Sequence, residues 1–293
     1  MHSDLPMPAI PADLPWSQGA YLLLDGVSLP DLQHKLYQWS ENPEFEPLYL
    51  GTEWHELSDL SPCLVRLSGL QDPVLQRFIE SAQHEWGYLI FADAGFDEIL
   101  RHLRWLICVQ PAQGDAMLLR LADPAVAHQL LATGSSHLFG PIEQICAADC
   151  IEGCWWQHQR VGEPHQQAAQ KPYRLSDTEL EALGEVSFRQ VVMRLDSHMR
   201  EFFPHYQQAL RGRERLTHLR ELAERAYRQG MGSEREIILY ANVFGFLGEQ
   251  KLENHPDIAS LLNGKSPQTP AQRIEQAAGL AQARATQIEG NHS

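Results

Sequence analysis

Arg120 is the residue whose placement most suggests chemistry, because it stands inside the apolar stretch MLLRL at 117–121 and is soon followed by Asp123. In a strand, alternation puts its side chain on the same face as Leu118, in a semi-buried layer. A desolvated guanidinium needs a carboxylate partner, which Asp25, Glu98 or Asp123 could supply. We interpret Arg120 as half of a structural ion pair, because no nucleophile or phosphate-binding loop accompanies it; a catalytic or anion-binding arginine is the alternative.

The fourteen histidines are the next candidates for chemistry. A hydrolase could combine His102, His128 or His137 with Asp123 and a serine at position 135 or 136. The sequence contains no G-x-S-x-G, H-E-x-x-H, G-x-x-x-x-G-K-[ST] or strand-following G-x-G-x-x-G motif to frame such a site. The charged run HELSD at 55–59 is typical of a solvated loop. We predict that the chain is not an enzyme, and a hydrolase built around His102, Asp123 and His128 is the alternative.

The cysteine spacing raises the question of a metal site. Cys146, Cys150, Cys154 and His158 recur at every fourth position, so on a helix they would lie along one face like metal ligands. Against this, Gly153 fits a hairpin turn, and zinc sites more often use two-residue spacers. We therefore predict buried, inert cysteines, with no metal and no cofactor.

Composition narrows the classes of partner and compartment. The chain has 293 residues, a formal net charge of −15 and an isoelectric point near 5.3. It has no run rich in lysine or arginine, so we expect no nucleic-acid partner. Apolar runs such as YLLL and LIF are far shorter than the roughly 20 residues of a membrane-spanning helix, so we expect no membrane association. Five cysteines and an N-terminal stretch without the features of a secretory signal predict a reduced, cytoplasmic protein.

Short apolar runs alternate with amphipathic segments in the first 121 residues. Helical spacing of apolar residues predicts helices at 29–40, 72–87 and 96–106. Apolar runs bounded by turn residues predict strands at 20–25, 46–51, 63–69, 88–93, 107–110 and 117–121. The turn PAQGDA indicates that the last two strands form an antiparallel hairpin. This pattern predicts an N-terminal α/β lobe with a mixed sheet.

The second half of the chain has a different distribution of apolar residues. Apolar residues nearly vanish between Trp156 and Tyr173, which predicts a linker at 161–175. Capping-box pairs at positions 176 and 179 and at 233 and 236 then indicate helices. We predict an α+β chain with these parts: a flexible N-terminal arm at 1–17, the α/β domain at 18–160, the linker, an all-helical lobe at 176–264, and a weakly ordered tail at 265–293.

A series of short motifs, in a fixed order over about residues 18–160, resembles the family called domain of unknown function 4123. The residues that carry the resemblance, which we interpret as structural, are Tyr21, Asp25, Gly26, Pro62, Trp86, Gly87, Arg104, Arg120, Asp123, Pro124, Gly140 and Pro141. The resemblance implies an adaptor chaperone of bacterial type VI secretion. Such a protein is non-enzymatic, binds a toxic effector in the cytoplasm, and promotes its loading onto the VgrG spike.

The helical lobe offers a candidate binding surface for that partner. Between Arg189 and Arg235 the sequence has ten arginines, no lysine and six acidic residues, so this stretch is locally basic. Arginine is favoured at protein interfaces because its planar guanidinium donates several hydrogen bonds. We predict partner contacts from Arg211, Arg213, Arg215 and Arg220. The alternative is a solvated helix face with charge pairs. A purely structural scaffold is a third possible function.

Overall fold

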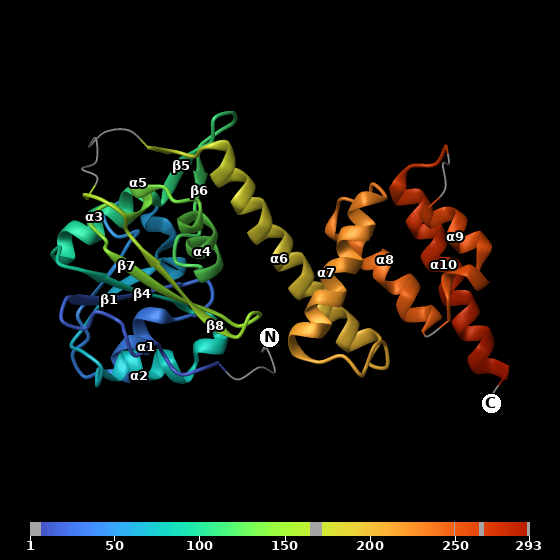
Figure 1. The fold of residues 1–293 in the computed structure, drawn as a ribbon, viewed down its shortest axis with the longest axis horizontal. Helices are drawn as coiled ribbons and strands as arrows, with labels where there is room; N and C mark the ends of the chain where they lie inside the picture. Colours follow the sequence, from blue (N-terminus) through green and yellow to red (C-terminus); the bar gives the residue numbers. More distant parts are fainter. Residues whose placement is uncertain (1–6, 165–171, 249, 264–266, 292–293) are drawn as a thin grey trace. The chain divides into compact units, whose positions relative to one another are not determined.

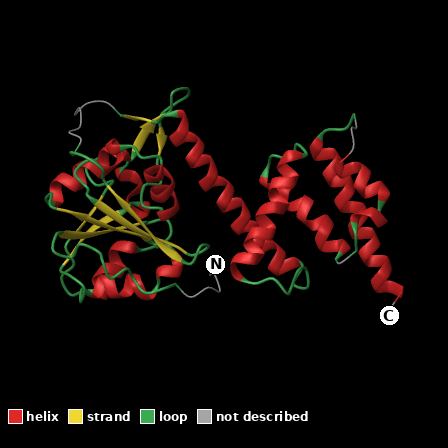
Figure 2. Cartoon of the chain, viewed as in Figure 1, coloured by secondary structure: helices red, strands yellow, loops and turns green. Residues whose placement is uncertain are grey.

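The protein is described here by a computed structural model that covers residues 7–164, 172–248, 250–263 and 267–291 (Figure 1). The chain forms two compact units, with Val186 as the last residue of the N-terminal unit and Ser187 as the first of the C-terminal unit. Figure 2 shows strands in the N-terminal unit and helices alone in the described part of the C-terminal unit. The predicted α+β class is therefore confirmed.

The N-terminal unit is built on a six-stranded sheet. Its strands, in spatial order, are β2 (Phe45–Pro47), β3 (Cys63–Leu67), β1 (Gly19–Leu24), β4 (Gly87–Ala92), β7 (Gln144–Asp149) and β8 (Cys154–Gln159). All five pairs of neighbouring strands are antiparallel. In the centre, Leu22 lies opposite Val65 on one side and Leu89 on the other. Both faces of the central strands are buried, which explains why these strands read as continuous apolar runs.

Helices cover both faces of this sheet (Figure 1). On one face α1 (Leu32–Trp39) and α2 (Pro73–Glu80) enclose a core that includes Leu22, Phe91 and Phe78. On the other face lie α3 (Phe96–Leu106), α4 (Pro124–Ala132) and α5 (Ser136–Phe139), and their core includes Leu23 and Leu103. Two short 3-10 helices, η1 (His55–Leu60) and η2 (Ala82–His84), complete the connections of this unit.

A second, three-stranded sheet consists of β6 (Met117–Leu118), β5 (Cys108–Gln110) and β9 (Tyr173–Arg174). The hairpin of β5 and β6 is antiparallel, as predicted. The pair β5–β9 is parallel, so the mixture of strand directions lies in this small sheet. β9 falls inside the stretch expected to be a linker, of which residues 165–171 lie outside the described residues. Leu175 and Val186 also belong to the N-terminal core, so this unit extends well beyond position 160.

The C-terminal unit begins within α6 (Asp177–Phe202). It continues with α7 (Gly212–Arg228), α8 (Glu234–Leu247), η3 (Leu252–Asn254), α9 (Pro256–Asn263) and α10 (Pro270–Asn291). Both predicted capping pairs are present. At the start of α6 the N–H of Glu179 donates to Ser176 Oγ over 3.2 Å, and at α8 Ser233 and Glu236 form a reciprocal capping box.

The C-terminal stretch differs from the weakly ordered tail expected at 265–293. Within the described residues it forms α10, which packs against α8 and α9. Ile274, Ala277 and Ala281 are fully buried, and Arg273 donates to the backbone carbonyls of Gln229 and Leu261. The apolar face of this helix consists largely of alanine, which gives little hydrophobic signal in the sequence but lets neighbouring helices approach closely.

The described part of the N-terminal arm, expected to be flexible, makes packing contacts with the rest of the unit. Leu14 is buried, and the ring of Trp16 meets Phe91 edge-on at a centroid distance of 5.1 Å. The Nε1 of Trp155 donates to the carbonyl of Pro8 over 3.0 Å. Apolar residues spaced among the prolines thus hold this extended stretch against the rest of the unit; residues 1–6 lie outside the described residues.

Over the part of the chain that the structure covers, no helix is both long and apolar enough to cross a membrane.

Candidate functional site

Several of the motif residues, although distant in sequence, converge where β1 ends. Asp25 follows β1 and is 1% exposed, and its N–H donates to the carbonyl of Trp86 over 2.7 Å. Gly87 lies opposite Leu24, and a Cβ added there would overlap the carbonyl of Leu23. A Cβ on Gly26 would overlap the backbone at Ser61. Both glycines are required because other parts of the backbone approach them too closely for a side chain.

Arg120 forms the predicted ion pair beside this point. Its Nη2 lies 2.6 Å from Asp25 Oδ2 and 2.8 Å from Ser28 Oγ, and its Nη1 lies 3.4 Å from Asp123 Oδ2. Burial is the largest single influence on the pKa of Arg120 and lowers it, but the charge and hydrogen bond of Asp25 and the charge of Asp123 together raise the pKa. Asp25 also accepts hydrogen bonds from the N–H groups of Val27 and Ser28. The ion pair therefore fixes the loop that connects β1 to α1.

Arg104, on α3, holds a second loop in a similar way. Its Nε donates to the carbonyl of Leu48 over 2.9 Å, and its Nη2 donates to the carbonyl of Pro47 over 3.0 Å and to Glu46 Oε1 over 3.1 Å. These residues end β2 and lead into the loop that contains η1. The far end of that loop is anchored by Ser61, whose Oγ accepts from the N–H of Tyr49 over 3.0 Å.

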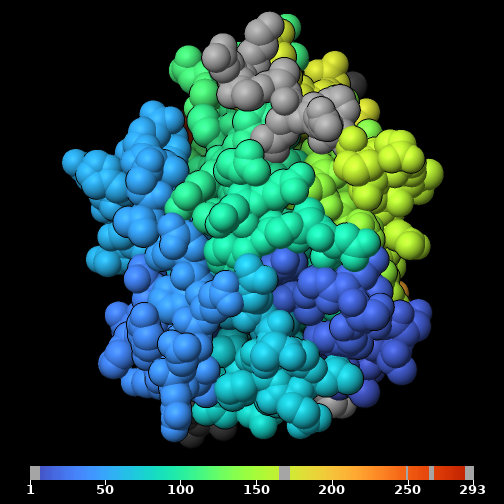
Figure 3. All heavy atoms as spheres, turned by 90° about the vertical axis from the view of Figure 1, so that its left-hand side faces the viewer, coloured from blue at the N-terminus to red at the C-terminus, as the bar shows by residue number. Residues whose placement is uncertain are grey.

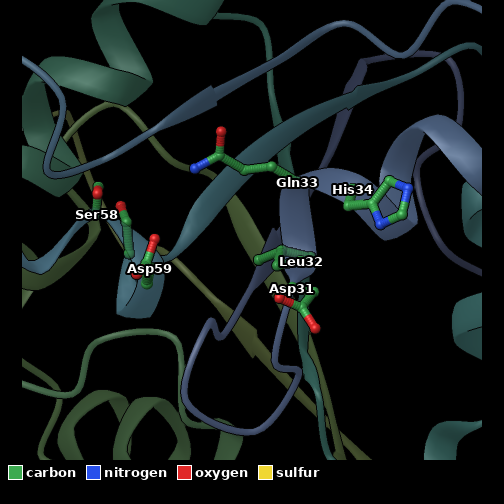
Figure 4. Close-up of a pocket in the computed structure, with 7 residues that line it drawn as sticks. Asp31, Leu32, Gln33, His34, Ser58 and Asp59 are labelled. Atoms are coloured by element: carbon green, nitrogen blue, oxygen red, sulfur yellow. The ribbon is translucent and has the colours of Figure 1, made fainter.

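A pocket of about 260 Å³ lies between the two loops (Figure 4). One wall is the start of α1, and the other is the end of η1 with the residue that follows it. Its lining residues are Asp31, Leu32, Gln33, His34, Ser58, Asp59 and Ser61. In Figure 4 the side chain of Gln33 extends from the α1 wall toward Ser58 and Asp59. The pocket is mainly polar. One of the loops that form it is held by Arg120, and the other is held at its start by Arg104 and at its end by Ser61.

Exposed leucine and valine side chains, together with carboxylates, lie on the two loops that form this pocket. The apolar members are Val27, Leu50, Leu57 and Leu60. The acidic members are Asp31, Glu53, Glu56 and Asp59. We call these eight residues, with the pocket, the acidic–apolar surface. In Figure 3 the light-blue atoms of the loop around residue 55 project at the edge of the N-terminal unit. The sequence indicated only a solvated loop here, because the contact of Gly26 with Leu60 and Ser61 links segments far apart in the chain.

The histidines of the hydrolase alternative serve separate structural contacts. His102 is buried, its Nε2 lies 2.9 Å from the carbonyl of Leu138, and burial lowers its pKa to about 4. A Cβ on Gly140 would overlap the His102 ring, which explains a glycine at that motif position. Asp123 is the N-cap of α4 and accepts from the N–H of Ala125. A buried, neutral histidine packed on a glycine and a capping aspartate give this alternative no support.

The second histidine pair lies between α4 and β8. The Nδ1 of His128 is 2.9 Å from His158 Nε2, and the His128 ring stacks on Trp156 at 4.4 Å. Burial, aided by the neighbouring His128, lowers the pKa of His158 to about 4. Ser135 Oγ pairs with the hydroxyl of Tyr173 at 3.1 Å, so it also serves a structural contact.

The three cysteines with metal-ligand spacing lie on a hairpin and not on a helix. Cys146 is on β7, Cys150 is in the turn, and Cys154 begins β8 opposite Asp149. Cys146 is fully buried in the core, and burial raises the pKa of its thiol to about 12. No group of three potential metal ligands occurs among the residues that the structure covers.

The remaining motif residues also make scaffold contacts. The Tyr21 hydroxyl donates to the carbonyl of Ala94 over 3.0 Å, which holds the turn before α3. Trp86 stacks with Trp39 at 5.8 Å. Pro62 precedes β3, Pro124 is the first residue of α4, and Pro141 follows the α5 turn. Tyr21 and Trp86 thus make contacts within the N-terminal unit, as Arg120 and Arg104 do.

The four arginines proposed for partner contact differ in exposure. Arg215 is buried, its Nε lies 2.6 Å from Asp196 Oδ1, and its Nη1 donates to the carbonyl of Tyr206. It is therefore an interior residue and does not form a binding surface. Arg220 is exposed, pairs with Glu224 at 3.1 Å and lies over the ring of Phe188. Arg211 and Arg213 are exposed at the start of α7.

Comparison with known proteins places the chain in a family. Residues 20–137 match the family described as Domain of unknown function (DUF4123), and a relative covers most of the chain at 34% identity, so this chain belongs to that family. The relative is Accessory protein VasW of Vibrio cholerae serotype O1 (strain ATCC 39315 / El Tor Inaba N16961). The similarity extends over 266 residues, 89% of this chain and 87% of the relative. A search of solved structures gave no match. The motif residues Gly140 and Pro141 lie beyond the matched range.

Proposed function

We propose that this protein is a cytoplasmic, non-enzymatic accessory protein of a type VI secretion system that binds one specific effector and promotes its loading onto the VgrG spike protein. The observation that carries the proposal is the 34% identity to a protein named as an accessory protein, over 89% of this chain. That similarity includes residues of both units. The secretion system, the effector and VgrG come from the family resemblance.

The side-chain contacts of the N-terminal unit support a binding role over catalysis. Arg120, Asp123 and His102, the residues most suited to chemistry, are engaged in an ion pair, a helix cap and a core contact. The same contacts position two surface loops. A scaffold that presents loops is the arrangement expected of a protein that recognises another protein.

The test is co-purification of the tagged protein from its native cytoplasm, followed by mass spectrometry and sizing. We expect a stoichiometric complex with one toxin-like effector, and VgrG in the same fraction when it is co-expressed. A tagged acidic protein of similar size from the same cells is the control for charge-driven capture. A protein that elutes free of effector, or that only associates with itself, contradicts the proposal and favours the scaffold alternative.

A genetic test addresses loading itself. Deletion of the gene is expected to abolish delivery of that effector while leaving the secretion apparatus assembled and other effectors delivered. Unchanged delivery in the deletion strain contradicts the loading role, even where binding is observed.

A further inference from the structure

We infer that the acidic–apolar surface docks a cationic, amphipathic segment of the effector. Basic side chains of this segment would face the four carboxylates, and its apolar side chains would cover the exposed leucines and valine. The inference rests on the proposed function, since it specifies where the accessory protein holds its partner and what chemistry that partner presents.

The apolar part of the surface is unusual in its exposure. Val27 is 49% exposed, Leu50 55%, Leu57 39% and Leu60 47%. All four lie on the two loops that flank one pocket. Single exposed aliphatic residues are ordinary, but a group of them beside a pocket marks an interaction site. Covering this group with apolar side chains of a partner would remove apolar area from water and so favour binding.

The charge of the surface specifies the partner. Residues 50–60 include Glu53, Glu56 and Asp59 but no lysine or arginine. Across the described residues, none of these three carboxylates, nor Asp31, forms an ion pair with a basic side chain. By contrast, the carboxylates that precede this loop in the chain, Glu44 and Glu46, are each paired with an arginine. The unpaired carboxylates therefore match a cationic partner by charge complementarity.

Asp31 is the acidic residue that belongs to the α1 wall of the pocket. It occupies the N-cap position of α1, where an aspartate usually accepts a hydrogen bond from the helix, but its side chain makes no capping bond. Its backbone is left-handed, with φ of 57° and ψ of 33°, a conformation that favours glycine. The carboxylate of Asp31 is therefore not used to cap the helix.

The surface is also held in shape before any partner arrives. Arg120 fixes the loop that carries Val27, and Arg104 fixes the start of the loop that carries Leu57. A prearranged surface loses little conformational entropy on binding, so a greater share of the contact energy appears as affinity.

Site-specific photocrosslinking tests where the partner lies. A photoreactive amino acid replaces Leu57 in the otherwise unchanged full-length chain, and the effector recovered in the co-purification is the probe. The control is the same replacement at Leu70, which is 47% exposed and belongs to the same unit. We expect crosslinks to the effector from position 57 and not from position 70, mapped to a segment rich in lysine or arginine. Crosslinks to a neutral or acidic segment, or to a second copy of this chain, would overturn the inference.

Charge reversal tests the electrostatic part. The triple variant E53K/E56K/D59K is expected to weaken effector binding at least tenfold at 0.15 M NaCl, and wild-type affinity should fall as salt is raised. The matched control is D93K/D115K/E163K, which changes three exposed loop carboxylates of the same unit by the same total charge. Both variants should keep the wild-type circular dichroism spectrum.

The outcomes separate the two proposals. If the acidic-surface variant and the control bind as tightly as wild type, the inference is overturned while the proposed function stands. If both variants weaken binding equally, the effect reflects net charge alone, and the inference is again overturned. If the folded wild-type protein binds no effector, the proposed function fails, and with it the inference.

Discussion

A buried aspartate in each unit pairs with an arginine, and the two pairs differ in what they hold. Arg215 and Asp196 are both 7% exposed and join α7 to α6 inside the helical unit. In the pair of Arg120 and Asp25, the aspartate is 2% exposed but the arginine side chain is 37% exposed. The second pair lies at the end of the central strand β1, where it holds a surface loop through Ser28.

An arginine–aspartate ion pair thus serves a different purpose in each unit. Between two helices it fixes a packing arrangement, and replacing both charges with apolar residues of similar size would preserve that arrangement. In the Arg120–Asp25 pair, the aspartate also accepts hydrogen bonds from the backbone N–H groups of Val27 and Ser28. An apolar residue at position 25 could not make those bonds. The Arg120–Asp25 pair is therefore less replaceable by apolar residues than the Arg215–Asp196 pair.

The largest expected effect comes from Asp25→Ala, which leaves Arg120 and two backbone N–H groups without their acceptor. We expect the free energy of unfolding of the N-terminal unit to fall by about 3–5 kcal/mol. All seven tryptophans lie in this unit, so urea unfolding followed by tryptophan fluorescence reports it alone. The control Asp93→Ala, at an exposed loop position, should stay within about 0.5 kcal/mol of wild type. A value for Asp25→Ala in that same narrow range would mean that the pair does not hold the loop.

Lowering the pH should reduce the stability of the N-terminal unit through His102. Its pKa is lowered to about 4 by burial, against 6.5 for an unperturbed histidine, so the folded state binds fewer protons than the unfolded state between these values. This contribution to stability is fully present above pH 6.5 and is lost as the pH falls toward 4; it amounts to about 3 kcal/mol. The variant His102→Gln should lose less stability over this range, measured by tryptophan fluorescence in urea at each pH. Equal slopes for the two proteins would show that His102 titrates normally in the folded state.

Arg215→Met should destabilise the helical unit by about 2–3 kcal/mol, less than the loss at Asp25, because Asp196 keeps its contact with Arg200 at 2.8 Å. Circular dichroism at 222 nm reports the helices of both units, so the part of its transition that does not coincide with the tryptophan transition follows the C-terminal unit. The tryptophan transition should stay unchanged. Combining the change with Asp196→Leu should recover most of the loss. If the double variant is less stable than Arg215→Met alone, apolar residues cannot replace the Arg215–Asp196 pair. The proposed difference between the two pairs would then be wrong.

The smallest effect is expected from Ser28→Ala, which removes one hydrogen bond of Arg120 and leaves its bonds to Asp25. We expect a loss of about 1 kcal/mol in the urea experiment. The change loosens the loop below the acidic–apolar surface without breaking the ion pair. A loss as large as that of Asp25→Ala would show that Ser28, and not the ion pair, positions the loop.

Local sequence patterns predicted much of this architecture. Runs of apolar residues marked the strands around Leu22 and Leu89, and capping pairs marked the starts of α6 and α8. A buried charge needs a partner, and this requirement alone reduced the candidates for Arg120 to three carboxylates, of which the structure uses Asp25 and Asp123.

The features that the sequence did not indicate depend on long-range contacts or on weak hydrophobic signals. Arg215 was expected on the surface, although it lies four residues before Leu219 and so shares the buried face of α7. That spacing was a usable signal. The acidic–apolar surface gave none, because it arises only when the loops that contain Val27 and Leu60 meet.

The parallel pair of β5 and β9 has a consequence for how the chain is made. A ribosome completes β5 at Gln110 long before it adds Tyr173 and Arg174, the partner strand. Until then the edge of β5 lacks this neighbour, and the core positions of Leu175 and Val186 are unfilled. The nascent N-terminal unit therefore carries an open strand edge during much of its synthesis, which favours aggregation of prematurely ended chains. A fragment that ends at residue 160 would share this defect, whereas one that ends after Val186 would contain the whole core.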